Sequence, residues 1–167
     1  GRKMASELAG KWKMSCIVRK LSDDQAVIVM VDSNLQREEI LPSEKAFAYK
    51  MKLDAMKRQG QRRDLTSVPL AQKFKGKTSR EILGEQVGES QDQIRRYIRL
   101  TELIPEILEM VDDKKISMRP AVELSYLTKE EQEILYDTME SEACTPSHAQ
   151  AIKIRKFSAE GRLNEDV

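Results

Sequence analysis

The chain has 167 residues, of which 34% are charged, 40% hydrophobic and 5% aromatic, a composition typical of a helical protein with extensive surface. Its formal net charge is +1, but residues 1–100 contain 21 Lys and Arg against 13 Asp and Glu, while residues 101–167 contain 8 against 15. Two cysteines and one histidine exclude a disulfide framework and a zinc-ligand set, and no apolar run reaches the roughly 18 residues of a membrane span. We therefore expect a soluble cytoplasmic protein whose basic half attracts an anionic partner.

The first 40 residues predict three short elements. Residues 4–9 are typical of a helix end closed by Gly10, and Ser15–Val18 is a short segment with strand character. A capping box of Ser22 and Gln25 opens a helix to about Ser33, and its AVIVMV run is apolar almost throughout. Such a run indicates burial against more protein than these residues supply.

A longer helix is predicted from Pro42, which suits the first helical position, to about Gln59. Its expected inner face consists of Phe47, Ala48, Met51 and Ala55. Between Gly60 and Lys77 the periodicity disappears, and five Lys and Arg residues stand against Asp64 alone. This stretch is either a flexible linker or an arm in which Lys75 and Lys77 contact phosphates.

Residues 79–100, SREILGEQVGESQDQIRRYIRL, have the pattern of a helix-turn-helix. Gly84 would let the partner helix come close, and Gly88 falls at the bend, where a positive φ favours glycine. Ser90 and Gln93 form a capping box for the second helix. Helical spacing gives each helix one apolar stripe, formed by Ile82, Leu83 and Val87 in the first and by Ile94, Tyr97 and Ile98 in the second.

The opposite face of the second helix carries amides and guanidiniums, and Gln pairs well with adenine and Arg with guanine in the major groove. The candidate base contacts are Gln91, Gln93 and Arg95, and Arg96 reaches either a base or a phosphate. Asp92 is more typical of a favourable charge at the helix start than of a cytosine contact. Phosphate contacts are expected from Thr78, Ser79, Arg80 and Ser90. The alternative is a plain helical hairpin with a solvated polar face.

The C-terminal half predicts a compact helical bundle. Pro105 opens a helix to about Asp112, and Thr128 with Glu131 caps another through Glu140. The segments KISMRPAVEL and CTPSHAQAI each place Ser or Thr before a helix with Pro near its start, and His148 is a helix-start residue in the second. The predicted fold is thus mainly all-α, with a helix-turn-helix and one short strand near the N-terminus.

Three segments in this order, VDSNLQREEILPSEKAFAYK, the helix-turn-helix and KISMRPAVEL, resemble the ParB family of plasmid and chromosome partition proteins. GRKMASELAG is similar to the end of the family's G-x-R-R-x-x-A-x-x-L-A-G segment. The resemblance implies that residues 1–41 are the remnant of a nucleotide-binding domain and that residues 42–167 are the DNA-binding domain. It also implies a palindromic centromere-like site, parS, a ParA-type ATPase as partner, a homodimer in the full-length protein, and association with the nucleoid or a plasmid.

Family members bind CTP and Mg²⁺ in the N-terminal domain, and the resemblance places Arg2, Asn34 and Arg37 in the remnant of that site. Ser33 stands where the family's Glu-Asn-x-x-Arg motif has its glutamate, and serine lacks the carboxylate that holds a metal. Asp32 lies about 100° around the helix and is a weak substitute. We therefore expect no cofactor, no metal and no catalysis in this chain, and CTP and Mg²⁺ only in a longer protein. The alternative is that Asn34 and Arg37 simply cap a helix end.

Ser117 and Arg119 resemble a second point at which the family clamps the DNA backbone, although Arg119-Pro120 replaces its usual Gly-His. Three other functions stay open. A KorB-like transcriptional repressor would use the same helix-turn-helix, and a CTP-hydrolysing clamp or a nuclease would be an enzyme. A protein-only helical adaptor would retain no DNA. The single histidine and the lack of an acidic metal cluster in the sequence argue against a nuclease.

Overall fold

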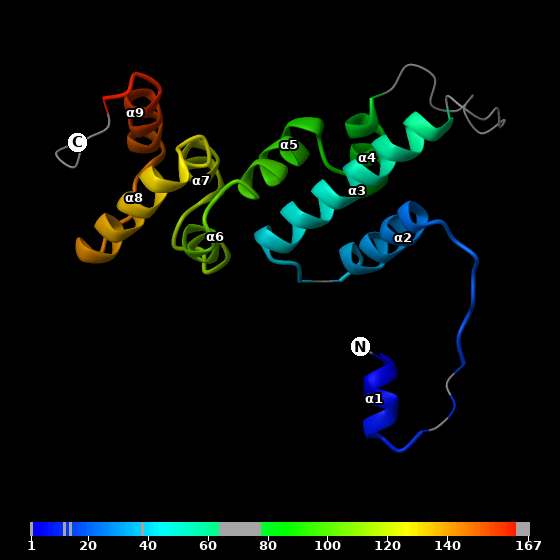
Figure 1. The fold of residues 1–167 in the computed structure, drawn as a ribbon. Helices are drawn as coiled ribbons and strands as arrows, with labels where there is room; N and C mark the ends of the chain where they lie inside the picture. The colour runs from blue at the N-terminus through cyan, green and yellow to red at the C-terminus, as the bar shows by residue number, and fades with distance from the viewer. Residues whose placement is uncertain (1, 12, 14, 38, 64–77, 163–167) are drawn as a thin grey trace.

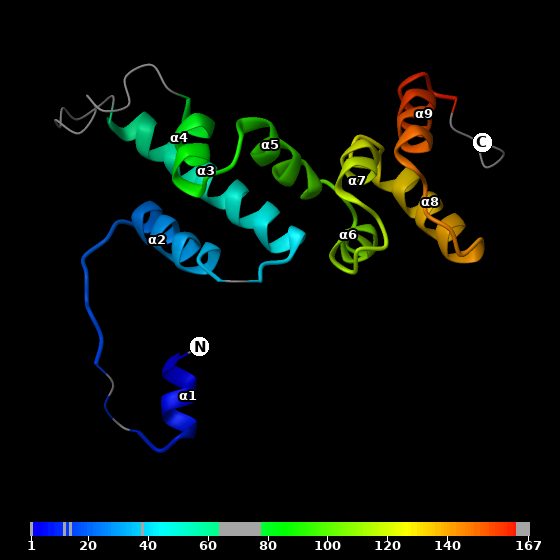
Figure 2. The ribbon, with the colours of Figure 1, turned by 180° about the vertical axis from the view of Figure 1, so that it is seen from behind.

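The computed structural model describes residues 2–11, 13, 15–37, 39–63 and 78–162, and its regular elements are α-helices (Figure 1). Helix α1 (Arg2–Leu8) lies well away from the others in two opposite views (Figures 1 and 2), and Gly10 ends it with a φ of +68°, as predicted. The strand expected at Ser15–Val18 is wrong. These residues have no regular structure, because a strand needs a partner and none occurs within the described ranges.

Helices α2 (Asp23–Leu35) and α3 (Pro42–Arg63) lie side by side (Figures 1 and 2). The predicted capping box of Ser22 and Gln25 is confirmed at the start of α2. Val31 is buried, but Val29 and Met30 are 44% and 47% exposed, so the apolar run of α2 is only partly covered. The helix therefore matches its predicted bounds better than its predicted burial.

The expected inner face of α3 is partly wrong. Phe47 and Met51 are exposed, while the side chains that face the neighbouring helices are Ala46, Tyr49, Lys52, Leu53 and Ala55. A lysine would not be assigned to a core by its hydrophobicity. Here Lys52 is buried because its Nζ contacts Asp32 Oδ1 of α2 at 2.5 Å, which neutralises the charge.

Helices α4 (Ser79–Val87) and α5 (Gln91–Leu100) pack on α3 around a small apolar core. Four helices follow and build a larger core: α6 (Pro105–Asp112), α7 (Met118–Leu124), α8 (Lys129–Ser141) and α9 (His148–Ala159). Tyr97 of α5 packs against both cores. The all-α fold, the helix starts at Pro105 and Thr128, and His148 as a helix-start residue are confirmed.

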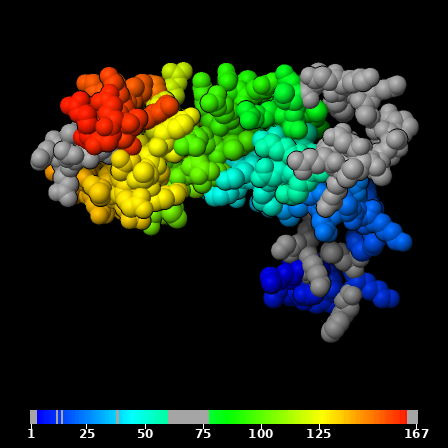
Figure 3. All heavy atoms as spheres, turned by 45° about the horizontal axis from the view of Figure 1, so that its top comes forward, coloured from blue at the N-terminus to red at the C-terminus, as the bar shows by residue number. Residues whose placement is uncertain are grey.

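Polar contacts connect these helices over long sequence distances. The buried side chain of Gln132 accepts from the Ile104 amide at 2.8 Å and donates to the Leu127 carbonyl at 3.0 Å. Ser43 at the start of α3 donates to the Asp112 carboxylate at the end of α6 through its hydroxyl and its amide. The space-filling view shows α2 to α9 as one elongated body (Figure 3). Among the described helices, none is both long enough and apolar enough to cross a membrane.

Candidate nucleic-acid interface

Gly84 of α4 lies close to the turn that leads into α5. A Cβ on this residue would lie 2.6 Å from the backbone oxygen of Glu89 and 3.6 Å from Cδ1 of Ile94. Gly88 ends α4 in the left-handed region with a φ of +72°, and the Glu89 amide donates to the Gly84 carbonyl at 3.1 Å. Both glycines therefore have the roles that their spacing predicts.

The caps of α4 and α5 differ from the sequence prediction. Thr78 and Glu81 form a complete capping box for α4, which places Thr78 in a cap as well as at the surface. The Ser90 hydroxyl accepts from the Gln93 amide at 3.1 Å, but the second half of the predicted box is missing. Gln93 instead donates from Nε2 to Sδ of Met118 at 3.4 Å, because α7 lies beside the start of α5.

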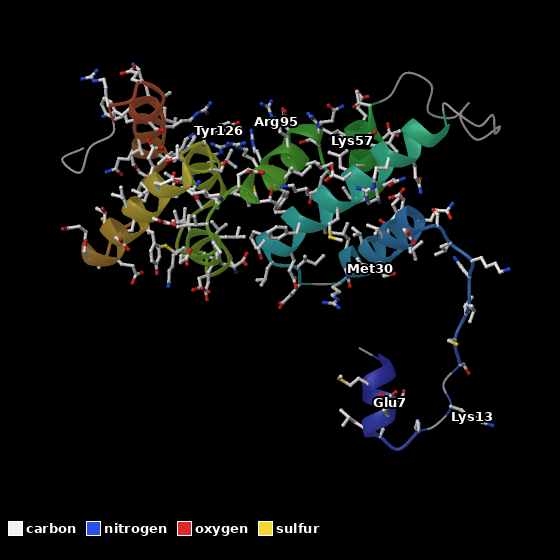
Figure 4. The ribbon with its side chains drawn as sticks, viewed as in Figure 1. Glu7, Lys13, Met30, Lys57, Arg95 and Tyr126 are labelled. Atoms are coloured by element: carbon white, nitrogen blue, oxygen red, sulfur yellow. The ribbon has the colours of Figure 1, made fainter. Side chains whose placement is uncertain are left out.

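The outer face of α5 carries the residue types that read bases. Gln91, Arg95 and Arg96 are exposed, and their side chains form no hydrogen bond or ion pair with the described part of the chain. Ile94 on the inner face is fully buried, and Arg95 points away from the helices (Figure 4). The α5 reading face formed by Gln91, Arg95 and Arg96 is therefore exposed to solvent.

The other predicted contacts surround this face. Thr78, Arg80 and Ser90 are exposed, Ser79 is half-buried, and Asp92 is exposed in the first turn of α5. Ser117 and Arg119 are also exposed at the start of α7, where Ser117 is the N-cap residue but its hydroxyl forms no cap hydrogen bond. That hydroxyl is not needed to start the helix and can serve a ligand.

Helix α5 is connected to α7 at both ends. Besides the Gln93–Met118 contact, Arg99 donates from Nε to the Ser125 hydroxyl at 3.0 Å and from Nη2 to the Ser125 carbonyl at 2.7 Å. These contacts fix the distance between the reading face of α5 and the start of α7. A ligand that contacts both therefore meets one rigid surface.

Helix α3 holds the turn between α4 and α5. Lys45 Nζ lies 3.1 Å from Glu89 Oε1 and 5.3 Å from the centre of the Tyr97 ring. Burial lowers the pKa of Lys45, but the Glu89 carboxylate and Tyr97 together raise it by more, so that it lies above its ordinary 10.5. Burial and the same carboxylate also raise the pKa of Tyr49. The charged lysine and the neutral phenol are thus both stabilised by the folded state.

The predicted nucleotide residues are only partly brought together. Asn34 and Arg37 line one depression of about 360 Å³, which is lined mainly by apolar side chains such as Met30 and Phe47. Asp32 is held by Lys52 instead, and the Ser33 hydroxyl donates to the Val29 carbonyl at 2.9 Å. Helix α1, which begins at Arg2, lies apart from α2 (Figure 1).

Some predicted residues cannot be placed. The side chain of Arg2 and the whole of Lys75 and Lys77 lie outside the described residues. The two cysteines, Cys16 and Cys144, are both free and exposed. The side chains that the structure describes include no group of His, Cys, Asp and Glu suited to hold a metal.

Comparison with known proteins decides the family. The family model described as ParB HTH domain matches residues 63–153, which is more than half of the chain and includes α4 to α8. The chain belongs to this family. The matched range contains the helix-turn-helix and the residues at the start of α7, so the ParB resemblance inferred from the sequence is confirmed.

Relatives are found among chromosome-associated proteins. A Nucleoid occlusion protein of Listeria monocytogenes is 34% identical over 122 residues, which are 73% of this chain and 36% of that protein. A Probable chromosome 1-partitioning protein ParB of Deinococcus radiodurans is 28% identical over 151 residues, 89% of this chain and 44% of that protein. The chain thus spans less than half the length of these relatives.

Among solved structures, the chain is similar to the C-terminally truncated chromosome-partitioning protein ParB from Caulobacter crescentus, which is complexed to the centromeric parS site. The two are 17% identical, with a TM-score of 0.49 over 95% of this chain and 71% of the other.

Proposed function

We propose that this chain binds double-stranded DNA sequence-specifically, with the α5 reading face in the major groove. The observation that carries the proposal is the division of α5. Ile94 is fully buried on its inner face, while Gln91, Arg95 and Arg96 are exposed and their side chains form no hydrogen bond with the described chain. Gln and Arg offer bidentate donors and acceptors to adenine and guanine, so the exposed types fit base recognition.

Contacts to the DNA backbone would fix the position of the α5 reading face along the duplex. We assign them to Thr78, Ser79 and Arg80 at the start of α4 and to Ser117 and Arg119 at the start of α7. The connections from α5 to α7 support the assignment of Ser117 and Arg119, because they hold α7 beside the α5 reading face. Backbone contacts position a protein on a duplex without reading its sequence.

For the cellular role, we propose that the longer protein binds a palindromic centromere-like site during plasmid or chromosome segregation. Support comes from the ParB HTH domain match and the Deinococcus relative. The same proposal includes a homodimer, a ParA-type ATPase as partner, and CTP with Mg²⁺ near Asn34 and Arg37. A second candidate is a role like that of the Nucleoid occlusion proteins, which the 34% identity to the Listeria protein favours.

Selection of bound duplexes from a random oligonucleotide pool tests DNA recognition directly. We expect this chain to enrich one short motif, which occurs as an inverted repeat if two copies bind together. A direct repeat would contradict the palindromic site. If no motif is enriched, sequence-specific binding is excluded, and if no duplex is retained at all, the protein-only adaptor replaces the proposal.

Replacement of Arg95 by Ala tests the reading role of α5. A bidentate Arg–guanine contact contributes about 1–3 kcal/mol of discrimination, so affinity for the selected motif is expected to fall about 5- to 150-fold. Affinity for random duplex should fall much less. The measurement is fluorescence anisotropy with labelled selected and random duplexes at one salt concentration.

The matched control is Arg80→Ala, which removes the same side chain from a predicted phosphate contact. It should weaken selected and random DNA about equally and lower the salt slope by about one. If Arg95→Ala also weakens both duplexes equally, Arg95 does not read a base.

A further inference from the structure

Two arginines from different helices enclose one exposed tyrosine. The guanidinium carbon of Arg99 in α5 lies 4.0 Å from the ring centre of Tyr126, and that of Arg155 in α9 lies 3.7 Å from it. Tyr126 follows the end of α7 and is 38% exposed, and the side chain of Arg155 is 43% exposed. The stack thus joins three helices and still faces solvent.

The charge of α9 differs from that of its surroundings. The C-terminal third of the chain is acidic, but α9 contains Lys153, Arg155 and Lys156 and no Asp or Glu. A surface helix that concentrates positive charge within an acidic region attracts an anionic partner locally. Arg155 is further oriented by Glu123, whose Oε2 accepts from Nη1 at 2.8 Å.

The stack lies on the same edge of the molecule as the α5 reading face. In Figure 4 the labelled Tyr126 and Arg95 are neighbours along the upper edge, and the space-filling view turned toward this edge shows α9 and α5 on one visible face (Figures 3 and 4). Arg99 belongs to α5 itself, so the stack has a fixed position relative to the α5 reading face.

We propose that the DNA-contacting surface continues from α5 across Tyr126 to α9, and that Arg155 binds a backbone phosphate of the duplex that flanks the bases read by α5. The inference rests on the proposed function. An arginine stacked on an aromatic ring keeps its planar set of donors in one orientation, which suits phosphate. Glu123 occupies one Nη1 donor of Arg155, and guanidinium has five N–H donors in all.

The test compares Arg155→Gln with Lys153→Gln in the whole chain. Both variants remove one positive charge from α9. Lys153 is also exposed, but it lies about 200° around the helix from Arg155, on another face. The probes are the selected motif as a short duplex and the same motif extended by about ten base pairs, one helical turn, on each side. Affinity is measured by anisotropy over a range of salt concentrations, with thermal unfolding as a check of the fold.

Arg155→Gln is expected to weaken the extended duplex about fivefold near 0.15 M salt and to lower its salt slope by about one, as loss of one phosphate contact predicts. Binding of the short duplex should stay unchanged, and Lys153→Gln should weaken the extended duplex much less than Arg155→Gln does, because Lys153 contributes only a general positive charge. Tyr126→Phe keeps the ring and should match the wild type, whereas Tyr126→Ala should behave like Arg155→Gln.

A variant that is expected to raise the affinity for DNA distinguishes phosphate binding by Arg155 from a merely structural role of this residue. Glu123→Gln removes the carboxylate beside Arg155, so affinity for the extended duplex should rise, which a loss of folding cannot cause. The inference is overturned if Arg155→Gln binds the extended duplex like the wild type, or if Lys153→Gln weakens it equally. Failure of the wild type to bind any duplex would instead overturn the proposed function.

Discussion

The small size of Gly84 allows the turn before α5 to pack closely against α4. Within a helix, replacement of Gly by Ala ordinarily stabilises by about 0.5–1 kcal/mol. At this position the new Cβ would lie 2.6 Å from a backbone oxygen of Glu89, which cannot rotate away as a side chain does. We therefore expect Gly84→Ala to lower the free energy of unfolding by about 1–3 kcal/mol. Urea unfolding followed by circular dichroism measures the change.

Gly88→Ala is the comparison for this prediction. An added Cβ at Gly88 has open space, so its cost comes only from the φ of +72° and should be about 1 kcal/mol. A Gly84→Ala variant that is as stable as the wild type, or more stable, would show that the backbone of Glu89 does not lie so close to Gly84.

At single residues, sequence prediction succeeded where the cause was local. Gly84 and Gly88 were recognised from their places within one supersecondary motif. The backbone amide of Gln93 caps onto Ser90 as predicted, whereas its side-chain amide contacts Met118, which is 25 residues further along the chain. No spacing rule within the motif contains that neighbour.

Among the elements, α3 is connected to the turn of the helix-turn-helix through Lys45 and Tyr49, which both interact with Glu89. The pKa of Lys45 is raised above 10.5 and that of Tyr49 above 10.0. Both groups therefore stabilise the fold fully below these values, and the stability falls as the pH rises, since the unfolded chain releases the protons first. We expect the thermal unfolding temperature to fall steeply above about pH 10. Calorimetry between neutral and strongly alkaline pH measures it.

Variants assign this alkaline loss to the two groups. Lys45→Met and Tyr49→Phe each remove one titrating proton while keeping most of the side-chain volume. Each should be less sensitive to pH above 10 than the wild type, and the double variant least of all. An unchanged alkaline slope in the double variant would assign the effect to other groups.

Helix starts were predictable because their signals lie within four residues. Four helices begin as predicted, two at Pro42 and Pro105 and two at the capping boxes of Ser22 and Thr128. The inner face of α3 was not predictable, because it includes Lys52, whose charge is neutralised by Asp32 of another helix. Hydrophobic periodicity cannot include a buried cation whose partner is 20 residues away.

Across the whole molecule, Tyr97 connects the two apolar cores. Its ring packs edge-on against Tyr49 with centres 5.6 Å apart, and it also contacts the core of α6 to α9. Tyr97→Ala should cost about 3 kcal/mol and let the two cores unfold separately. Hydrogen exchange measured helix by helix should then show different opening energies for α3–α4 and for α6–α8.

Tyr97→Phe is the matched control, because it keeps the ring and should retain one cooperative opening. If the cores stay equally protected in Tyr97→Ala, the backbone of α5 alone couples them.

At the scale of the whole molecule, the family, the all-α class and the helix-turn-helix were predictable from the order of motifs. The stack of Arg99, Tyr126 and Arg155 was not, because its members meet only through tertiary packing.

The separation of roles within α5 has an evolutionary consequence. Packing uses Ile94, Tyr97 and Ile98, whereas Gln91, Arg95 and Arg96 contribute nothing to the described core. Substitutions at the exposed positions can accumulate without loss of stability, so new target sequences are reachable in single steps from a folded ancestor. The same freedom makes these three positions suitable for randomisation in a search for altered DNA specificity, if the proposed function holds.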